Sequence, residues 1–369
     1  MRELSRGSLQ KTRLRKPDGR ELLLYGRGPI AADLRATGAV TSPDATRSHL
    51  RWHPLRGEWV AYATHRQDRT FLPGPSENPL APSRDPARPS EVPAGDYDVA
   101  VFENRFPTLS TAACASPAEI VPTRPGTGRC EVVVYTQDPK ASLGALPLWH
   151  VELLMDVWTD RWIELGASPG VEYVFPFENR GEEVGVTLTH PHGQIYAYPF
   201  IPPVAQRELA EQRRHIEEKG VGLLAWLLDA ELADGRRILY DGESAVAFVP
   251  VCARYAYEVW IAPRRAAPSL ADLDEAEKKD LARALKLVLL KLDGLWSRPF
   301  PYVLVFHQAP TDGRSHPEAH VHLEIYPPYR SRQRLKYLAG SELGAGVFTA
   351  DTLPEDRAAE LRGVSIEPF

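Results

Sequence analysis

One eight-residue pattern occurs twice in this chain, and this repetition limits the possible folds more than any other feature of the sequence. Residues 189–196 read Thr-His-Pro-His-Gly-Gln-Ile-Tyr, and residues 319–326 read Ala-His-Val-His-Leu-Glu-Ile-Tyr. The hydrophobic pattern around each copy predicts the same order of strand, helix, strand and strand. Internal duplication is the simplest account, so we expect two equivalent units.

Each predicted unit combines strands with one long amphipathic helix. The first unit has predicted strands at 130–135, 172–177 and 185–200 and a helix at 151–165. The second has predicted strands at 248–261, 302–307 and 319–326, and a helix that starts at the capping box of Asp274 and Glu277 and reaches Leu295. We therefore expect an α+β fold with antiparallel sheets and packed helices.

The chain of 369 residues is long enough for two such units. Residues 1–45 are polar and read as an irregular N-terminal extension, and the units are expected at 46–215 and 216–369. Seven prolines between residues 72 and 95 exclude a regular helix there. We call residues 72–95 the proline-rich segment and expect an ordered meander or a long loop.

Composition excludes several classes of partner. A net charge of −5 and a pI near 6.2 provide no basic field for a nucleic acid. No apolar run approaches the roughly 20 residues that span a bilayer, and the first residues lack a signal-peptide core. The protein is expected to be cytoplasmic, with no nucleic-acid or membrane partner. The three cysteines, Cys114, Cys130 and Cys252, are expected to be buried and unpaired.

The first copy of the repeat carries the strongest chemical signal. In an extended backbone alternate side chains share a face, so His190, His192 and Gln194 are expected to project together. Pro191 restricts the local backbone, and Gly193 would let a ligand approach the main chain. The second copy has leucine and glutamate at the places of this glycine and glutamine. One copy therefore reads as catalytic and the other as structural.

From about His53 to the C-terminus the chain resembles the galactose-1-phosphate uridylyltransferases of the histidine-triad superfamily. The resemblance rests on several motifs, which are Trp-His-Pro-Leu at 52–55, His65 with Arg66 and Arg69, Phe-Glu-Asn-Arg-Phe-Pro at 102–107, Phe-Glu-Asn-Arg-Gly at 177–181 and His-Pro-His-Gly-Gln at 190–194. The resemblance implies that the two units are histidine-triad-like repeats.

The reaction implied by this resemblance is a double displacement. His192 would attack the α-phosphorus of UDP-glucose, release glucose 1-phosphate and hold the uridylyl group until galactose 1-phosphate takes it. A main-chain oxygen, such as the carbonyl of His190, would keep the other ring nitrogen of His192 as a donor. Gln194 would donate a hydrogen bond to a non-bridging phosphate oxygen.

The resemblance also implies substrate contacts. Arg66 and Arg69 match positions that contact the nucleotide phosphates, although their spacing alone is more typical of solvated surface charges. The remaining matches are Asn104 and Phe106 for uridine, Asn179 and Thr187 for phosphate, and Lys336 and Glu342 for the sugar phosphate. The last two would come from the other subunit of a homodimer. Residues 346–349 read Gly-Val-Phe-Thr where relatives place an amide, which leaves the preferred hexose open.

Two metal sites are usual in this family, and only one is expected here. Asn78, Ala81 and Pro139 stand where the Cys-containing zinc site has ligands, so His190 is left alone and we predict no metal there. At the second site the family ligands are all matched, by Glu208, His307, His320 and His322. We expect Zn²⁺ or Fe²⁺ in a structural role, against the alternative of polar groups on a half-exposed sheet.

Three other functions stay open from the sequence. An ADP-sugar or dinucleotide phosphorylase that transfers adenylyl groups would share the repeat and the nucleophile. A metal-dependent phosphohydrolase would use His190, His320 or His322 as catalytic ligands. A nucleotide-binding module without activity would tolerate loss of His192, but the complete His-Pro-His-Gly-Gln run argues against that reading.

Overall fold

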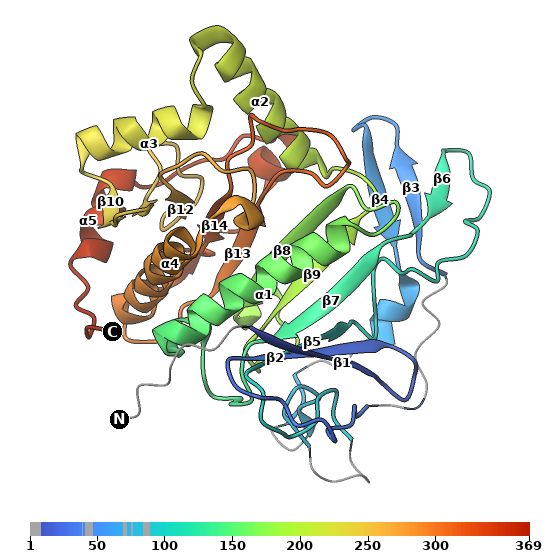
Figure 1. Cartoon of the computed structure of the whole chain (residues 1–369). Coiled ribbons are helices and arrows are strands. Elements are labelled where there is room, and N and C mark those ends of the chain that lie inside the picture. The colour runs from blue at the N-terminus through green and yellow to red at the C-terminus, as the bar shows by residue number, and fades with distance from the viewer. Residues whose placement is uncertain (1–8, 39, 41–46, 69–71, 75–76, 84–88) are drawn as a thin grey trace.

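The computed structural model describes residues 9–38, 40, 47–68, 72–74, 77–83 and 89–369. An antiparallel sheet of 11 strands runs through the molecule in the order β1-β2-β5-β7-β9-β8-β13-β14-β12-β11-β10 (Figure 1). Its strands are β1 (Gln10–Arg15), β2 (Glu21–Gly26), β5 (Val99–Glu103), β7 (Arg129–Val134), β8 (Tyr173–Arg180), β9 (His192–Tyr198), β10 (Ile238–Asp241), β11 (Ala245–Phe248), β12 (Val259–Pro263), β13 (Tyr302–His307) and β14 (His322–Tyr326).

The other elements attach to this sheet. A second sheet holds β3 (His49–His53), β4 (Glu58–Tyr62) and β6 (Thr123–Pro125), and a third holds β15 (Tyr329–Ser331) and β16 (Arg334–Leu335). The α-helices of the described chain are α1 (Leu148–Gly166), α2 (Pro203–Lys219), α3 (Leu223–Asp234), α4 (Glu275–Leu295) and α5 (Pro354–Arg362). Among the described residues, no helix combines the length and the apolar character that crossing a membrane requires.

The strand order confirms the duplication. In space β5-β7-β9-β8 has the same topology as β11-β12-β14-β13. Along the chain α1 lies between β7 and β8, and α4 lies between β12 and β13. The last strand of the first group in space, β8, pairs antiparallel with β13 and joins the two halves into one sheet. Each half is therefore a copy of one strand-strand-helix-strand-strand unit, as the repeated sequence predicts.

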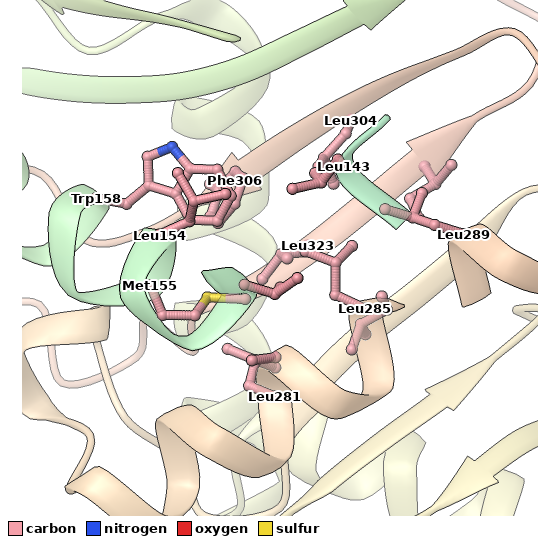
Figure 2. Packing of buried hydrophobic residues seen from close by; sticks show 14 of the residues in the cluster. Leu143, Leu154, Met155, Trp158, Leu281, Leu285, Leu289, Leu304, Phe306 and Leu323 are labelled. Atoms are coloured by element: carbon pink, nitrogen blue, oxygen red, sulfur yellow. The ribbon is translucent and has the colours of Figure 1, made fainter. Parts of the chain in front are cut away.

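The helices α1 and α4 lie side by side on one face of the sheet (Figure 1). The predicted capping box starts α4, because the Asp274 carboxylate accepts from the Glu277 backbone N–H at 2.9 Å and the Glu277 carboxylate accepts from the Asp274 backbone N–H at 2.8 Å. Figure 2 shows the packed side chains between these helices and the sheet, which include Leu154, Met155, Trp158, Leu281, Leu285, Leu289, Leu304, Phe306 and Leu323. This shared core holds both repeats in one unit.

Strand residues alternate between the two faces of the sheet. In β5 the side chains of Val99 and Val101 join the core under the helices, whereas Ala100 and Phe102 pack on the opposite face. Leu80 and Val92 of the proline-rich segment cover that opposite face, and the described part of the segment contains no α-helix, as predicted. In β9 the same alternation directs Ile195 toward the helices. His192 and Gln194 are consequently directed to the opposite face.

Several boundaries predicted from the sequence are wrong. The N-terminal extension is not irregular throughout, because β1 and β2 form a hairpin at the edge of the main sheet. The predicted strand 185–200 is paired only as β9, and the predicted strand 248–261 is two strands, β11 and β12, that pair with each other. In both regions a loop interrupts an apolar run whose pattern alone does not show the break. Two of the three cysteines, Cys114 and Cys252, are exposed and not buried.

Candidate active site

The strand β9 holds His192 at the end of a ladder that is fixed on both sides. β7 pairs with it so that Val134 lies opposite His192, and β8 pairs with it so that Phe177 lies opposite Gln194. Central strands paired on two edges have little freedom to slip in register. His192 and Gln194 are therefore held on the same face, as the two-residue spacing predicts.

One hydrogen bond fixes the orientation of the His192 ring. Its Nδ1 lies 2.7 Å from the backbone oxygen of His190. A carbonyl oxygen only accepts, so Nδ1 carries the proton and the lone pair of the neutral ring is on Nε2. Burial lowers the pKa of His192, which keeps this ring neutral near pH 7. The hydrogen bond to the carbonyl of residue 190 expected from the sequence is present.

A pocket opens beside His192 on the face of the sheet that the proline-rich segment covers. Its apolar walls come from Leu80, Phe102, Phe106 and Val132. Its polar lining includes Arg66, Glu91, Asn104, Arg105, Thr187, His192 and Gln194. We call it the aromatic pocket. Aromatic and aliphatic side chains together with polar groups suit a base with a phosphate attached.

Two of the predicted binding residues are tied to the pocket wall. Arg66, in a 3-10 turn at Thr64–Asp68, donates from Nη1 to the Phe106 carbonyl at 2.7 Å. The Asn104 Oδ1 accepts from the Phe106 backbone N–H at 2.9 Å. These bonds hold the loop after β5 against the pocket and leave the amide nitrogen of Asn104 as a possible donor to a ligand. The Arg66 side chain also hydrogen-bonds the Tyr196 hydroxyl.

His192 also borders a second cavity. This cavity is lined by His190, Asn179 and Arg180 of the first repeat, by Lys140 after β7, and by Arg298 of the second repeat. Glu178, Glu182, Glu183 and Asp293 also line it, so charges of both signs face this cavity. Asn179 thus lines this second cavity and does not line the aromatic pocket. His192 lines both cavities.

The structure adds Glu91 to the pocket, a residue that the sequence did not single out. Its carboxylate is nearly buried and lies 2.6 Å from Lys16 Nζ and 2.8 Å from Arg20 Nη2. Both cations belong to the turn of the N-terminal hairpin. The glutamate is in a proline-rich loop with no periodic pattern, and no sequence signal connects it with that hairpin.

The role expected for Gly193 is wrong. This residue points to the helix face of the sheet, where a Cβ would overlap the Tyr135 hydroxyl and lie 3.0 Å from the Phe177 backbone oxygen. The glycine therefore makes room for the buried ring of Tyr135 and does not open the backbone to a ligand.

A group of metal-ligand residues lies in the second repeat. Ligand atoms of Glu208, His307 and His322 all fall within 4.8 Å of one another. His322 Nδ1 lies 2.8 Å from the backbone oxygen of His320, which leaves Nε2 as the nitrogen that could bind a cation. In the structure this Nε2 lies 3.4 Å from a Glu324 carboxylate oxygen. The buried His307 ring has no well-formed hydrogen bond at either nitrogen, although its Nδ1 lies 2.8 Å from a Glu208 oxygen. A close pair without hydrogen-bond geometry fits ligands arranged around a cation.

His320 is not part of this group. Its Nε2 lies 2.8 Å from the Pro263 carbonyl, just as His190 Nε2 lies 2.7 Å from the Thr136 carbonyl. The same backbone contact is therefore present in both repeats, and in each it occupies Nε2 of the histidine. Among the described residues, the group whose ligand atoms lie within 4.8 Å of one another does not include His320, the fourth ligand predicted from the sequence.

The remaining predicted residues lie elsewhere. Lys336 and Glu342 form an ion pair at 3.3 Å in the loop around Gly340–Ala345, and neither lines the two cavities beside His192. Arg69 falls outside the described residues. The predicted active-site residues that do gather around the aromatic pocket are Arg66, Asn104, Phe106, Thr187, His192 and Gln194.

Comparisons with family models and with known proteins all point to one family. The family model for the galactose-1-phosphate uridyl transferase N-terminal domain matches residues 39–202, and the model for the C-terminal domain matches residues 208–367. The chain belongs to this family. It is 38% identical to the galactose-1-phosphate uridylyltransferase of Thermotoga maritima over 86% of this chain and 99% of that protein. It is also 38% identical to the Streptomyces lividans protein of the same name, over 97% and 98%.

A solved structure supports the same assignment. A chain described as a uridylyltransferase matches with a TM-score of 0.77 and 31% identity, over 86% of this chain and 98% of that one. Relative to the uridyl transferase family models, the hairpin of β1 and β2 lies before the first matched residue. The contact of Lys16 and Arg20 with Glu91 is therefore made by a segment outside both family models.

Proposed function

We propose that this protein transfers a uridylyl group between UDP-glucose and galactose 1-phosphate through a covalent intermediate on His192. The observation that carries the proposal is the geometry of this ring, which is neutral, holds its proton on Nδ1 against the carbonyl of His190, and borders two cavities. Membership of the galactose-1-phosphate uridyl transferase family supports the substrate class.

In the first half-reaction Nε2 of His192 attacks the α-phosphorus. A nitrogen–phosphorus bond forms, the bond from phosphorus to the bridging oxygen breaks, and glucose 1-phosphate leaves with that electron pair. In the second, a phosphate oxygen of galactose 1-phosphate attacks the same phosphorus and Nε2 leaves. The carbonyl of His190 stabilises the Nδ1–H while the ring carries positive charge in the intermediate.

The pocket residues have separate tasks in this scheme. Phe102 and Phe106 would enclose the uracil, and Arg66 would balance phosphate charge. Gln194, two residues after His192 on the same face, would donate to a non-bridging oxygen. An amide cannot protonate a leaving group in the way that an imidazolium can, which favours transfer over hydrolysis.

Two further features belong to the proposal. Glu208, His307 and His322 would hold a structural Zn²⁺ or Fe²⁺ that ties α2 to β13 and β14. The protein would act as a homodimer in which Lys336 and Glu342 of one subunit serve the sugar phosphate bound to the other. Their position away from both cavities beside His192 of the same chain agrees with a role across an interface.

Intact-protein mass spectrometry tests the function. After mixing with UDP-glucose, the wild type should gain the mass of one uridylyl group and lose it on addition of galactose 1-phosphate. Peptide mapping should place the adduct on the peptide with His192 and not on the repeat-related peptide with His322, and His192→Ala should give no adduct. An adduct with ADP-glucose alone would assign the protein to the adenylyl-transferring branch, and no adduct with either donor would refute the proposal.

A further inference from the structure

One amide of the proline-rich segment reaches the histidine that supports the nucleophile. The Nδ2 atom of Asn78 lies 3.1 Å from Nδ1 of His190, whose side chain is buried. We propose that Asn78 is a positioning residue for His192 and acts through His190. This inference rests on the proposed function, because it concerns how His192 is presented to phosphorus.

The partners of His190 select one protonation state. The Asn78 Oδ1 accepts from the Leu80 backbone N–H at 3.0 Å, which orients the amide so that its NH₂ group faces the imidazole. An amide nitrogen only donates, so Nδ1 of His190 must accept. On the other side Nε2 lies 2.7 Å from the Thr136 carbonyl and must donate. Both contacts require the neutral ring with its proton on Nε2, and burial lowers the pKa of His190 in agreement.

His190 connects these two hydrogen bonds to His192. Its backbone oxygen accepts the hydrogen bond from Nδ1 of His192 at 2.7 Å. The His190 ring is held between the proline-rich segment and Thr136, two residues after the end of β7, so neither its ring nor its carbonyl can shift freely. The Asn78 amide therefore contributes to the angle at which Nε2 of His192 meets a substrate.

The contact is separate from substrate binding. Pro79 and Leu80 form part of the wall of the aromatic pocket, whereas Asn78 does not line it. Removal of the amide should therefore slow transfer of the uridylyl group while the affinity for UDP-glucose stays close to that of the wild type.

Rapid-quench measurement of uridylyl-enzyme formation tests the inference. We expect Asn78→Ala to slow adduct formation about tenfold, with little change in the concentration of UDP-glucose that gives half-maximal rate. Gln137→Ala is the matched control. The Gln137 side chain donates to the backbone oxygens of Gly95 at 2.8 Å and Tyr97 at 2.7 Å, so it ties down the C-terminal end of the same segment without a bond to His190.

Asn78→Asp should give a result that a mere loss of rigidity in the proline-rich segment would not give. A carboxylate only accepts, so it would favour a proton on Nδ1 of His190 and turn the ring into an imidazolium next to His192. Positive charge there opposes the positive charge that the His192 ring gains during attack. As the pH is lowered, protonation of His190 should reduce the rate of Asn78→Asp in a step that Asn78→Ala does not show. His192 and Asp138 also face His190, but they are the same in both variants, so the additional step would come from the new carboxylate.

The outcomes separate this inference from the proposed function. Equal loss of rate in Asn78→Ala and Gln137→Ala, or no loss in Asn78→Ala, would overturn the role of Asn78. A ¹⁵N spectrum of the histidine-labelled wild type that shows a protonated Nδ1 on His190 would overturn it without any variant. Absence of an adduct in the wild type would instead refute the proposed function itself.

Discussion

Substitution of Gly193 by alanine should destabilise the fold by a collision with one identified side chain. The added Cβ would overlap the hydroxyl of Tyr135 and lie 3.0 Å from both Cζ of that ring and the Phe177 backbone oxygen. Tyr135 is 1% exposed, and Phe177 is in the paired strand β8, so neither can move away easily. Overpacking of a buried site costs about 1–3 kcal/mol, and we expect a value near the upper end.

A double-mutant cycle with Tyr135→Phe isolates this collision. Loss of the hydroxyl removes the most severe overlap but leaves the contacts with Cζ and with the Phe177 oxygen. Tyr135→Phe alone should cost about 1 kcal/mol or less. The double variant should then be more stable than the sum of the two single changes predicts, by about 1 kcal/mol or more.

Urea denaturation followed by tryptophan fluorescence and circular dichroism measures these free energies of unfolding. The slopes with denaturant should agree among the four proteins, so that midpoints can be compared. Strictly additive effects would show that the Tyr135 hydroxyl is not what excludes a side chain at position 193. Unchanged stability of Gly193→Ala would refute the packing argument altogether and restore the view that the glycine serves a ligand.

Three further outcomes follow from the site. The rate of uridylylation should rise with pH to a plateau with its midpoint below 6.5, because burial lowers the pKa of His192 and only the neutral ring attacks; a midpoint above 6.5 would contradict this assignment. Zn²⁺ or Fe²⁺ added to metal-free protein should raise the melting temperature, and Glu208→Ala should remove that rise in differential scanning calorimetry. Phe106→Ala should weaken UDP-glucose binding by about 1–3 kcal/mol, measured by titration calorimetry in the His192→Ala background to prevent turnover.

The histidines also affect stability at acid pH. Burial lowers the pKa values of His150, His190 and His192 in the folded state. Below the unfolded-state pKa of about 6.5 the unfolded chain then binds more protons than the folded one, so stability falls as the pH is lowered through this range. The pKa values of Glu178 and His322 are raised to about 8 and about 9 and act in the opposite direction, so the effect is measured as a difference between two proteins. Between pH 7 and pH 5 the urea midpoint of the wild type should fall by more than that of His150→Gln, and an equal fall would contradict the direction of the His150 shift.

Local patterns in the sequence are enough to predict the fold class, the duplication and the shared face of His192 and Gln194. The repeat at 189–196 and 319–326, the apolar period of α1 and α4 and the capping box of Asp274 are all read within short windows. Backbone geometry at this scale follows from side-chain alternation and from hydrogen bonds between near neighbours. For the same reason the shared face of His192 and Gln194 follows from their two-residue spacing alone.

Contacts between distant segments depend instead on the tertiary structure. No pattern near Glu91 indicates Lys16 and Arg20, and none near His190 indicates Asn78 as its partner. Likewise Gly193 reads as a ligand-binding residue until the ring of Tyr135 is found in the space beside it. Such contacts arise when strands and loops far apart in the chain are brought together. Burial then determines which ionisable groups are charged and how much space is left beside a residue, and a local sequence pattern contains neither kind of information.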